Sequence, residues 1–329
     1  MPPQWKYKKD PFTGRKKKMS PKLTEDSYGS IKGELGRMVG EWRTLRSRKS
    51  TLVGLINLQR EDGRVAMDTF TIGTNTFRCR HRGIVNIPGA RALIGSKVRQ
   101  CFIAEVGRVL VSADSDSNQL RGFAHYLNNS EVSAAIATGT QEEGTDVHTR
   151  TANLLGIERP RAKDTTYALL FGSGDATLAE SAGRRGEGVQ VRKELDDAFP
   201  GFKELSESVE EEWDTNADKY GRGFVTGLDG RRVYCERRKA FNALLQCFEA
   251  VTCKEACVKA ESMLREEGIP AKLVAHIHDE FTYEVFAEDS ERVSEIMEYC
   301  FGEHITNHYN LNCPMGGSAA VGPTWAEVH

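Results

Sequence analysis

Apolar and polar residues alternate along residues 273–285, LVAHIHDEFTYEV, as they do in a half-buried pair of strands. The centre of this stretch carries Asp279 and Glu280 side by side. Two adjacent carboxylates are costly to bury in a strand unless a cation compensates their charge. The apolar run GRVLVSAD, residues 107–114, predicts another strand, which also ends on an acid, Asp114. The predicted strand pair at 273–285 and the predicted strand at 107–114 therefore each carry an aspartate.

Helical patterns dominate most of the remaining chain. Between residues 33 and 53, apolar residues recur every three or four positions and Arg or Lys takes other positions, which predicts an amphipathic helix with a basic side. Residues 223–235, GFVTGLDGRRVYC, predict a hairpin that turns at Asp229 and Gly230. The first 30 residues show no periodicity and predict an extended basic arm, and residues 64–112 predict short strands and turns. Further helical patterns cover about residues 117–218, 238–267 and 288–308.

The composition is that of a globular protein without a membrane span. Of the 329 residues, 39% are hydrophobic and 28% are charged. No apolar run approaches the roughly 18 residues that a spanning helix needs, and the basic N-terminus lacks the apolar stretch of a secretory signal. We therefore expect a cytoplasmic protein. The eight cysteines form no CxxC pair, which favours buried thiols over a zinc site.

Charge is divided unevenly along the chain. Residues 1–100 hold 22 Lys and Arg against 8 Asp and Glu, whereas the remainder holds 23 against 39. A basic region favours a polyanionic partner, and acids gathered elsewhere are able to hold divalent cations. If the strands ending at Asp114 and carrying Asp279 are neighbours in one sheet, the two carboxylates would suit Mg²⁺. Either aspartate, taken singly, is equally consistent with a structural ion pair.

A second group of candidate residues lies in ERPRAKDTTYALLFGSG, residues 158–174. Pro160 suits the first turn of a helix, and from there two cations and two aromatic rings follow at steps of four, so that they share one broad face. Cations at one end and rings at the other match a nucleoside triphosphate. A helix with an exposed basic end and core-facing rings is the alternative. The four residues are Arg159, Lys163, Tyr167 and Phe171.

Three ordered segments make the sequence recognisable. DSDSNQLRGFAHYL (114–127), RPRAKDTTYALLFGSG (159–174) and HIHDEF (276–281) resemble the three polymerase motifs of family A DNA polymerases, the family of bacterial DNA polymerase I and of the replicases of short-tailed phages. The ending GPTWAEVH is similar to the phage branch. The resemblance implies an α+β right-hand polymerase fold, with a small antiparallel sheet in the palm and helical fingers. It assigns residues 1–60 to a basic arm and thumb remnant, 61–123 and 236–329 to the palm, and 124–235 to the fingers.

The resemblance also implies a two-metal mechanism of phosphoryl transfer. Asp114 and Asp279 would hold two Mg²⁺ ions, the Ser115 carbonyl would complete one coordination sphere, and Glu280 would adjust the site. The incoming deoxynucleotide and the primer-template are the implied substrates. His148, Arg159 and Lys163 would contact the triphosphate. Residues at primer-template positions are Arg78, Phe171, Asn242, Gln246 and His278.

Tyr167 would lie against the incoming sugar, where a tyrosine goes with ready acceptance of dideoxynucleotides in this family. The chain departs from the family pattern at Gln119, where Glu is usual, and at Phe171, where Tyr is usual. The usual pair is hydrogen-bonded, and replacing both members leaves a neutral amide beside an apolar ring, so we interpret the pair as a compensated change. Gln119 should still block a 2′-hydroxyl. Asp116, where serine is usual, is interpreted as a solvated charge.

No segment of the chain matches the exonuclease-like domain or the complete thumb of the family. We therefore expect a chain without editing activity, and favour a split phage replicase in which a separate polypeptide supplies the exonuclease and remaining thumb; a processivity factor is a further possible partner. A single-subunit RNA polymerase and a non-catalytic nucleic-acid-binding subunit are the alternatives. A zinc hydrolase built on His304 and His308 is disfavoured because the HExxH pattern is absent.

Overall fold

The structure is a computed structural model that describes residues 5–9, 16–21, 33–84 and 87–328, with side chains described from residue 33 onward. The chain divides into two compact units. None of the described helices is both long and apolar enough to cross a lipid bilayer. The first unit comprises residues 1–67 and 83–102, and the second comprises residues 68–82 and 103–329.

The first unit contains a strand pair and one long helix. Strands β1 (Trp5–Lys9) and β2 (Lys16–Pro21) are antiparallel, so part of the predicted extended arm is a pair of strands, while the rest of that arm lies outside the described residues. Helix α2 (Glu34–Asn57) confirms the predicted helix. Its apolar side chains are mostly exposed, with 75% of Leu35 and 55% of Trp42 accessible. A short helix, α3 (Gly95–Arg99), completes the unit.

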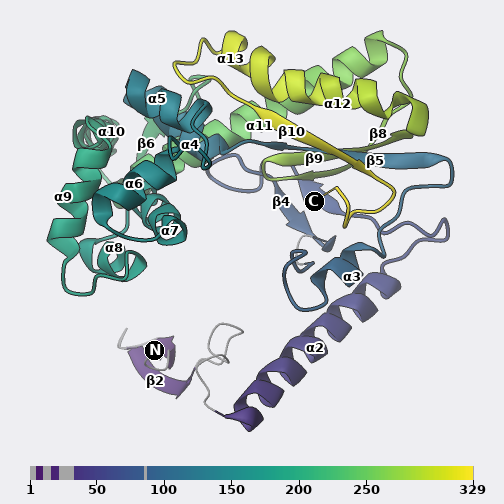
Figure 1. The fold of residues 1–329 in the computed structure, drawn as a ribbon, viewed down its shortest axis with the longest axis horizontal. Coiled ribbons are helices and arrows are strands. Elements are labelled where there is room, and N and C mark those ends of the chain that lie inside the picture. Colours follow the sequence, from purple (N-terminus) through teal and green to yellow (C-terminus); the bar gives the residue numbers. More distant parts are fainter. Residues whose placement is uncertain (1–4, 10–15, 22–32, 85–86, 329) are drawn as a thin grey trace. The chain divides into compact units, whose positions relative to one another are not determined.

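A four-stranded antiparallel sheet with the order β10-β5-β9-β8, called the central sheet below, lies to one side of the helices that make up much of the second unit (Figure 1). Strand β5 begins in a run of branched apolar residues, as strand propensity favours, and both of its faces are buried from Leu110 to Ala113. Strand β9 is buried except at its last residue, Phe286. The bounds are β5 (Arg108–Ser115), β8 (Lys272–Ile277), β9 (Glu280–Phe286) and β10 (Gly317–Gly322).

Helices from the C-terminal part cover one face of this sheet (Figure 1). Phe281, Tyr283 and Phe301 are fully or almost fully buried in the core between the sheet and these helices, and the rings of Phe281 and Phe301 stack at 4.8 Å. The layer therefore packs on β5 and β10 and buries apolar side chains of β9. Its helices are α11 (Ala240–Glu266), α12 (Ser290–Tyr299), the π-helical turn η4 (Cys300–His304) and α13 (Ile305–His308).

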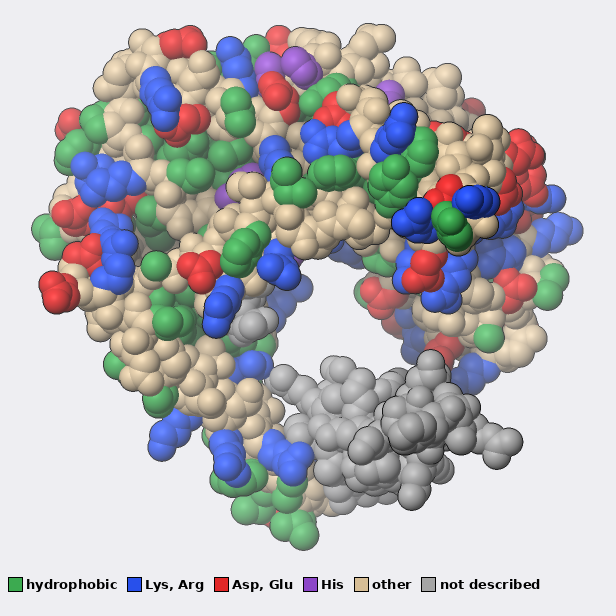
Figure 2. Space-filling model, turned by 180° about the vertical axis from the view of Figure 1, so that it is seen from behind, with side chains coloured by type: hydrophobic (Ala, Val, Ile, Leu, Met, Phe, Trp, Pro, Cys, Tyr) green, Lys and Arg blue, Asp and Glu red, His purple; other side chains and the backbone are tan. Residues whose placement is uncertain are grey.

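Seven helices between β5 and the β6–β7 hairpin make up the helical part of the second unit. Their shared core contains Phe123, Phe199 and Phe202, whose rings meet edge to face. Acidic and basic side chains are interspersed over this part, at the right of Figure 2, which is typical of a solvated surface. The helices are α4 (Asn118–Leu127), α5 (Ser130–Ala137), α6 (Val147–Leu155), α7 (Arg159–Leu170), α8 (Asp175–Ser181), α9 (Gly188–Ala198) and α10 (Phe202–Thr215).

Two small antiparallel strand pairs complete the unit. Strands β6 (Gly223–Thr226) and β7 (Arg232–Cys235) confirm the predicted hairpin, and Gly230 in its turn has a φ of 82°. Strands β3 (Asp68–Phe70) and β4 (Arg80–Arg82) form the other pair. The mixture of helices with small antiparallel sheets confirms the predicted α+β class. Six of the eight cysteines are buried thiols and all eight are free, as expected.

One sequence-based interpretation needs correcting. The alternating stretch 273–285 is a pair of strands, as predicted, but its two acids are not in the middle of a strand. His278 and Asp279 form the turn between β8 and β9, and Glu280 begins β9. His278 adopts a left-handed φ of 57°, a conformation that sequence patterns assign to Gly or Asn, so the turn carries no sequence signal.

Candidate active site

Two aspartates from distant segments lie at the same edge of the central sheet, where β5 ends and β9 begins. In the β5–β9 ladder Asp114 lies opposite Glu280, and the N–H of Ser115 donates to the carbonyl oxygen of Asp279 at 3.0 Å. The strands are therefore neighbours, as a shared metal site requires. Asp114 is exposed and Asp279 is half-buried. Asp279 forms no ion pair with any described Lys or Arg, so its carboxylate is available to a cation.

Glu280 lies on the same face of the sheet as Asp114 but is held within the protein. Its carboxylate accepts a hydrogen bond of 2.6 Å from the hydroxyl of Ser112, which is also 2.7 Å from the hydroxyl of Thr282. Glu280 is 5% exposed. The glutamate is thus a buried neighbour of the two aspartates, and the more accessible oxygen donors at this edge are those of Asp114 and Asp279.

Ser115, at the end of β5, is anchored to the long helix α11. Its hydroxyl accepts a hydrogen bond of 2.9 Å from the side-chain amide of Asn118, which also donates to the hydroxyl of Thr252 at 3.1 Å. All three residues are buried. These contacts fix where the backbone turns from β5 into α4, immediately after Asp114.

Helix α7 carries the predicted row of cations and rings, and Pro160 lies in its first turn, as expected. The rings of Tyr167 and Phe171 are 5.9 Å apart, which confirms that they share a face. The Lys163 side chain is exposed, and the Phe171 ring is 43% exposed. Lys163 and Phe171 are therefore the exposed members of the predicted row.

Arg159, at the start of α7, is paired with Asp146, a residue that the sequence analysis did not single out. Nη2 of Arg159 is 2.9 Å from Oδ1 of Asp146. The same carboxylate caps α6, because it accepts hydrogen bonds from the N–H groups of His148 and Thr149. Arg159 lowers the pKa of the Asp146 carboxyl against the opposing effect of burial. An aspartate two positions before His148 was a recognisable helix-cap signal in the sequence.

His148 is a buried, neutral imidazole beside this ion pair. Its pKa is lowered to about 4, chiefly by burial and also by the positive charges of Arg159 and Lys163, while the charge of Asp146 opposes them. Its Nδ1 atom is buried without a partner among the described residues. The ring centroid lies 6.1 Å from that of Tyr167. At neutral pH this histidine offers a hydrogen bond to a ligand and not a positive charge.

Tyr167 lies within electrostatic reach of two acids. Burial raises the pKa of its phenol, and the negative charges of Asp279 and Glu249 raise it further. The phenol therefore stays protonated at neutral pH.

Gln119, in the first turn of α4, is bound to a glutamate on α11. Its Nε2 atom donates to Oε2 of Glu249, and the guanidinium of Arg78 donates to Oε1 of the same carboxylate, from Nε at 2.7 Å and also from Nη2. Glu249 is 2% exposed. No hydrogen bond between Gln119 and Phe171 is present in the described part of the chain. Gln119 is thus paired with an acid, which the sequence analysis missed.

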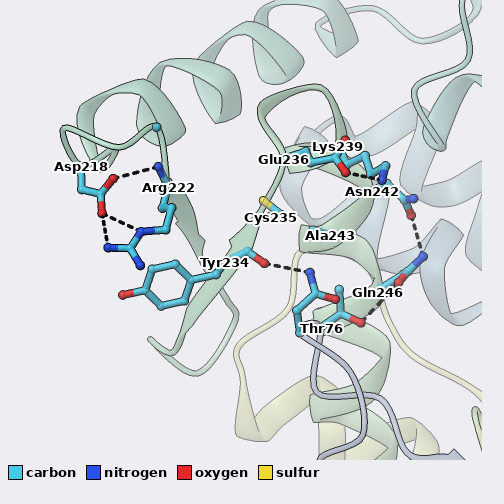
Figure 3. Close-up of a pocket in the computed structure, with 13 residues that line it drawn as sticks. Thr76, Asp218, Arg222, Tyr234, Cys235, Glu236, Lys239, Asn242, Ala243 and Gln246 are labelled. Carbon is cyan, nitrogen blue, oxygen red and sulfur yellow. Dashed lines mark hydrogen bonds and ion pairs between the residues drawn. The ribbon is translucent and has the colours of Figure 1, made fainter. Parts of the chain in front are cut away.

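Asn242 and Gln246 line a polar cavity of about 900 Å³ that is shown in Figure 3. Nε2 of Gln246 donates to Oδ1 of Asn242 at 3.0 Å, and the hydroxyl of Thr76 donates to Oε1 of Gln246 at 3.3 Å. The paired side chains of Asp218 and Arg222 lie on the other side of the cavity. The start of α11, the β6–β7 hairpin and the loop before β4 therefore enclose a space with several hydrogen-bonding groups.

Two further sequence candidates lie at different places in the second unit. His278 is exposed in the β8–β9 turn, where its ring meets that of His81 edge to face at 5.6 Å. Asp116 is not simply solvated, because its carboxylate accepts a hydrogen bond of 2.9 Å from the hydroxyl of Ser318 on β10. Asp116 is therefore tied to a neighbouring strand.

His304 and His308 lie together with Glu255 of α11. Nε2 of His304 is 3.2 Å from Oε1 of Glu255, and one possible ligand atom from each of the three residues lies within 4.8 Å of the others. The group sits among the helices that cover the sheet. It supplies two of the nitrogen donors that zinc prefers, but the glutamate is part of no HExxH pattern.

Comparisons with known proteins place this arrangement in a family. The model of DNA polymerase family A matches residues 6–327. The DNA-directed DNA polymerase of Escherichia phage T7 is 29% identical in an alignment of length 306 that covers 82% of this chain and 42% of that protein. The DNA-directed DNA polymerase of Escherichia phage Phieco32 is 25% identical in an alignment of length 393 that covers 93% of this chain and 62% of that protein.

The fold has a solved counterpart as well. The POL domain of Pol1 from M. smegmatis, in a complex with DNA primer-template and dNTP, superposes with a TM-score of 0.76 at 22% sequence identity, covering 87% of this chain and 52% of that one. That likeness confirms the predicted polymerase fold. The chain spans only 42% and 62% of the two phage relatives. Since the family model extends over almost its whole length, this chain belongs to DNA polymerase family A.

Proposed function

We propose that the chain is a template-directed DNA polymerase that adds deoxynucleotides to the 3′-hydroxyl of a primer. Membership of the family supports this, and one structural observation carries it. Asp114 and Asp279, far apart in sequence, lie at the same edge of the central sheet, tied together by the hydrogen bond from Ser115 to Asp279. Neighbouring carboxylates repel one another unless a cation lies between them, so this juxtaposition supports a cation site.

The donors at this edge suit Mg²⁺. Carboxylate oxygens are the ligands that this ion prefers, and Asp114 is exposed while Asp279 has no described cationic partner. We propose that these two carboxylates and the carbonyl of Ser115 hold two ions. When bound, such a pair activates the primer hydroxyl and stabilises the charge on the leaving pyrophosphate. Glu280, held by Ser112, contributes negative charge nearby without being a direct ligand.

The nucleotide would bind between α7 and this edge. Arg159 and Lys163 would contact the triphosphate as cations, and His148 would contact it as a neutral hydrogen-bonding group, because its pKa is lowered to about 4. Tyr167 would lie against the sugar, and Gln119 would block a 2′-hydroxyl. The closeness of Tyr167 to the acidic edge supports this arrangement.

The primer-template would lie against the residues that the resemblance assigns to it. Asn242 and Gln246 border the cavity of Figure 3, whose hydrogen-bonding groups suit a strand of DNA. Minor-groove acceptors are similar for all base pairs, so such groups are able to hold DNA without reading its sequence. Arg78, Phe171 and His278 would complete this surface.

A separate polypeptide is part of the proposal. The exposed apolar residues of α2, including Met38 and Trp42, support a protein partner that would supply the exonuclease and the remaining thumb. The chain and its Met38→Asp, Trp42→Asp variant would be affinity-purified from the cell that makes them, and exonuclease activity would be assayed. We expect exonuclease activity in the wild-type preparation and none in the preparation of the variant. Equal or absent exonuclease activity in both preparations would remove the separate subunit from the proposal.

Primer extension tests the central function. Purified chain, with a primer-template, would be given deoxynucleotides or ribonucleotides, with and without Mg²⁺. We expect extension with deoxynucleotides in the presence of Mg²⁺ and its loss in Asp114→Ala. Extension mainly with ribonucleotides would show an RNA polymerase instead, and DNA binding without any incorporation would show a binding subunit.

A further inference from the structure

Glu249 is a buried acid next to the proposed nucleotide site that the proposed mechanism does not use. It lies in the middle of α11, between buried residues on both sides, Phe248 and Ala250, and only 2% of it is exposed. A buried carboxylate is costly unless it is paired and hydrogen-bonded. Its presence in an otherwise apolar segment therefore indicates a specific task.

The partners of Glu249 are both proposed substrate-contacting residues. One carboxylate oxygen accepts hydrogen bonds from Nε and Nη2 of Arg78, and the other accepts one from Nε2 of Gln119. Both carboxylate oxygens are thus engaged. Burial raises the pKa of Glu249, and Arg78 opposes that effect while the charge of Asp279 adds to it. The glutamate therefore lies within electrostatic reach of the proposed metal-binding edge.

The charge of Glu249 decides which way the amide of Gln119 points. A carboxylate accepts hydrogen bonds and has none to donate, so the NH₂ group of the amide must face it. The carbonyl oxygen, Oε1, is then at the other end of the amide, where it is buried and has no partner among the described residues. Without the carboxylate, the two ends of the amide would be free to exchange.

We propose that Glu249 is a positioning residue for sugar selection: it locks the amide of Gln119 in one orientation and holds Arg78 beside it. The inference rests on the proposed polymerase function, in which Gln119 lies against the 2′ position of the incoming nucleotide. A side chain that blocks a hydroxyl by its bulk discriminates well only if it is held in place. Glu249 thus acts through Gln119 and does not itself touch the nucleotide.

Glu249→Gln tests this with the smallest change of shape. It removes the charge, so that the Gln119 amide is able to bond in either orientation. We expect the ratio of kcat/KM for a deoxynucleotide to that for the matching ribonucleotide to fall roughly tenfold or more, as the loss of a hydrogen bond to a charged group implies. We also expect KM for the deoxynucleotide to rise more than kcat falls. Glu249→Asp, which keeps the charge but shortens the reach, should lower the ratio too and serves if Glu249→Gln does not fold.

A double variant separates positioning from a structural role. In the Gln119→Ala background, Glu249→Gln should leave the sugar ratio unchanged, because the residue through which it acts is gone. The matched control is Glu284→Gln, which removes another buried carboxylate, 1% exposed and within 3.5 Å of Lys272, from strand β9. It should lower the thermal midpoint without moving the ratio.

The outcomes distinguish this inference from the function on which it rests. A wild-type chain that extends no primer overturns both. A wild-type chain that extends primers, with an unchanged sugar ratio in Glu249→Gln and Glu249→Asp, overturns only the role of Glu249. An effect of Glu249→Gln that is equally large with and without Gln119 also overturns it, since the glutamate would then act by another route.

Discussion

The backbone N–H of Ser115 donates a hydrogen bond of 3.0 Å to the carbonyl oxygen of Asp279. This bond extends the β5–β9 ladder by one step beyond the pair of Asp114 and Glu280. The turn that carries Asp279 is thus fastened to the end of β5 by main-chain atoms. The separation of the two aspartates is therefore set by backbone geometry and does not depend on either carboxylate.

It follows that Asp279→Asn should abolish catalysis without harming the fold. The amide has the size of the carboxylate but is a poor ligand for Mg²⁺, so we expect primer extension to fall by at least about 100-fold. The thermal midpoint should be unchanged or higher, because the substitution removes a negative charge close to other acids. Asp116→Asn is the matched control: it alters an aspartate bonded to Ser318 and should retain activity within about threefold. Near-normal extension by Asp279→Asn at any Mg²⁺ concentration would contradict the metal site.

The pH dependence of stability should report the environment of His148. Burial lowers its pKa to about 4 in the folded chain, whereas an unfolded histidine has a pKa of about 6.5. Between these values the unfolded chain binds a proton that the folded chain does not. The stability that the folded chain gains by keeping His148 neutral is therefore fully present above pH 6.5 and is lost as the pH falls toward 4. The pKa of His276 is also lowered to about 4, chiefly by burial. His276 should therefore add to the loss of stability at acidic pH.

His148→Gln should consequently lose less stability on acidification than the wild type does. Urea denaturation at pH 7 and pH 5 would give the free energies of unfolding, and we expect the two pH-dependent losses to differ by about 1–2 kcal/mol. His308→Gln, which alters an exposed histidine, should follow the wild type. Identical losses for His148→Gln and the wild type would show that the imidazole is not held neutral by its surroundings.

Features that depend on a local residue pattern, such as the face of a helix, are predicted best from the sequence. The row from Arg159 to Phe171 lies along α7 as expected, because steps of four place side chains on one face of any helix. The pairing of β5 with β9 could be stated from the sequence only as a condition for a shared metal site, since pairing of distant strands depends on the whole fold. The turn at His278 and Asp279 could not be located, because a left-handed histidine has no distinctive neighbours in the sequence.

Glu249 also shows that contacts between distant residues cannot be predicted from local sequence. A single glutamate amid buried apolar positions of a long helical pattern was a signal that could have been noticed. Its meaning, however, lies in partners 171 and 130 residues away, Arg78 and Gln119. No spacing rule connects residues at such separations, so the substitution at Gln119 could be interpreted from sequence only through Phe171, the neighbour that the resemblance implies, and not through the acid that it contacts.

Tyr167 offers a test of the proposed sugar-binding side of the site. The phenol is half-buried and close enough to Asp279 and Glu249 for their charges to raise its pKa. If its hydroxyl replaces the missing 3′-hydroxyl of a dideoxynucleotide as a hydrogen-bonding group, Tyr167→Phe should lower dideoxynucleotide use relative to deoxynucleotide use by at least roughly tenfold. Competition between the two nucleotides in primer extension measures the ratio. Tyr299→Phe, a tyrosine 39% exposed on α12, should leave it unchanged. A ratio that stays constant in Tyr167→Phe would remove this tyrosine from the sugar site.

The basic first third of the chain makes a quantitative prediction about DNA binding. Residues 1–100 carry 22 Lys and Arg against 8 Asp and Glu, and Arg37 and Lys49 are exposed on α2. Each phosphate that a cation neutralises releases condensed counterions, so the logarithm of the binding constant should fall linearly with the logarithm of the salt concentration. Removing two phosphate contacts should reduce that slope by about two.

Fluorescence anisotropy with a labelled primer-template, repeated over a series of salt concentrations, measures the slope. The Arg37→Ala, Lys49→Ala double variant should bind DNA more weakly at low salt and approach the wild type at high salt, because only the electrostatic part of the binding is lost. Lys203→Ala, which alters an exposed lysine of α10 paired with Glu207, should keep the wild-type slope. If the double variant also kept that slope, α2 would not contact the phosphates, and the positive charge of this helix would have to serve the protein partner instead.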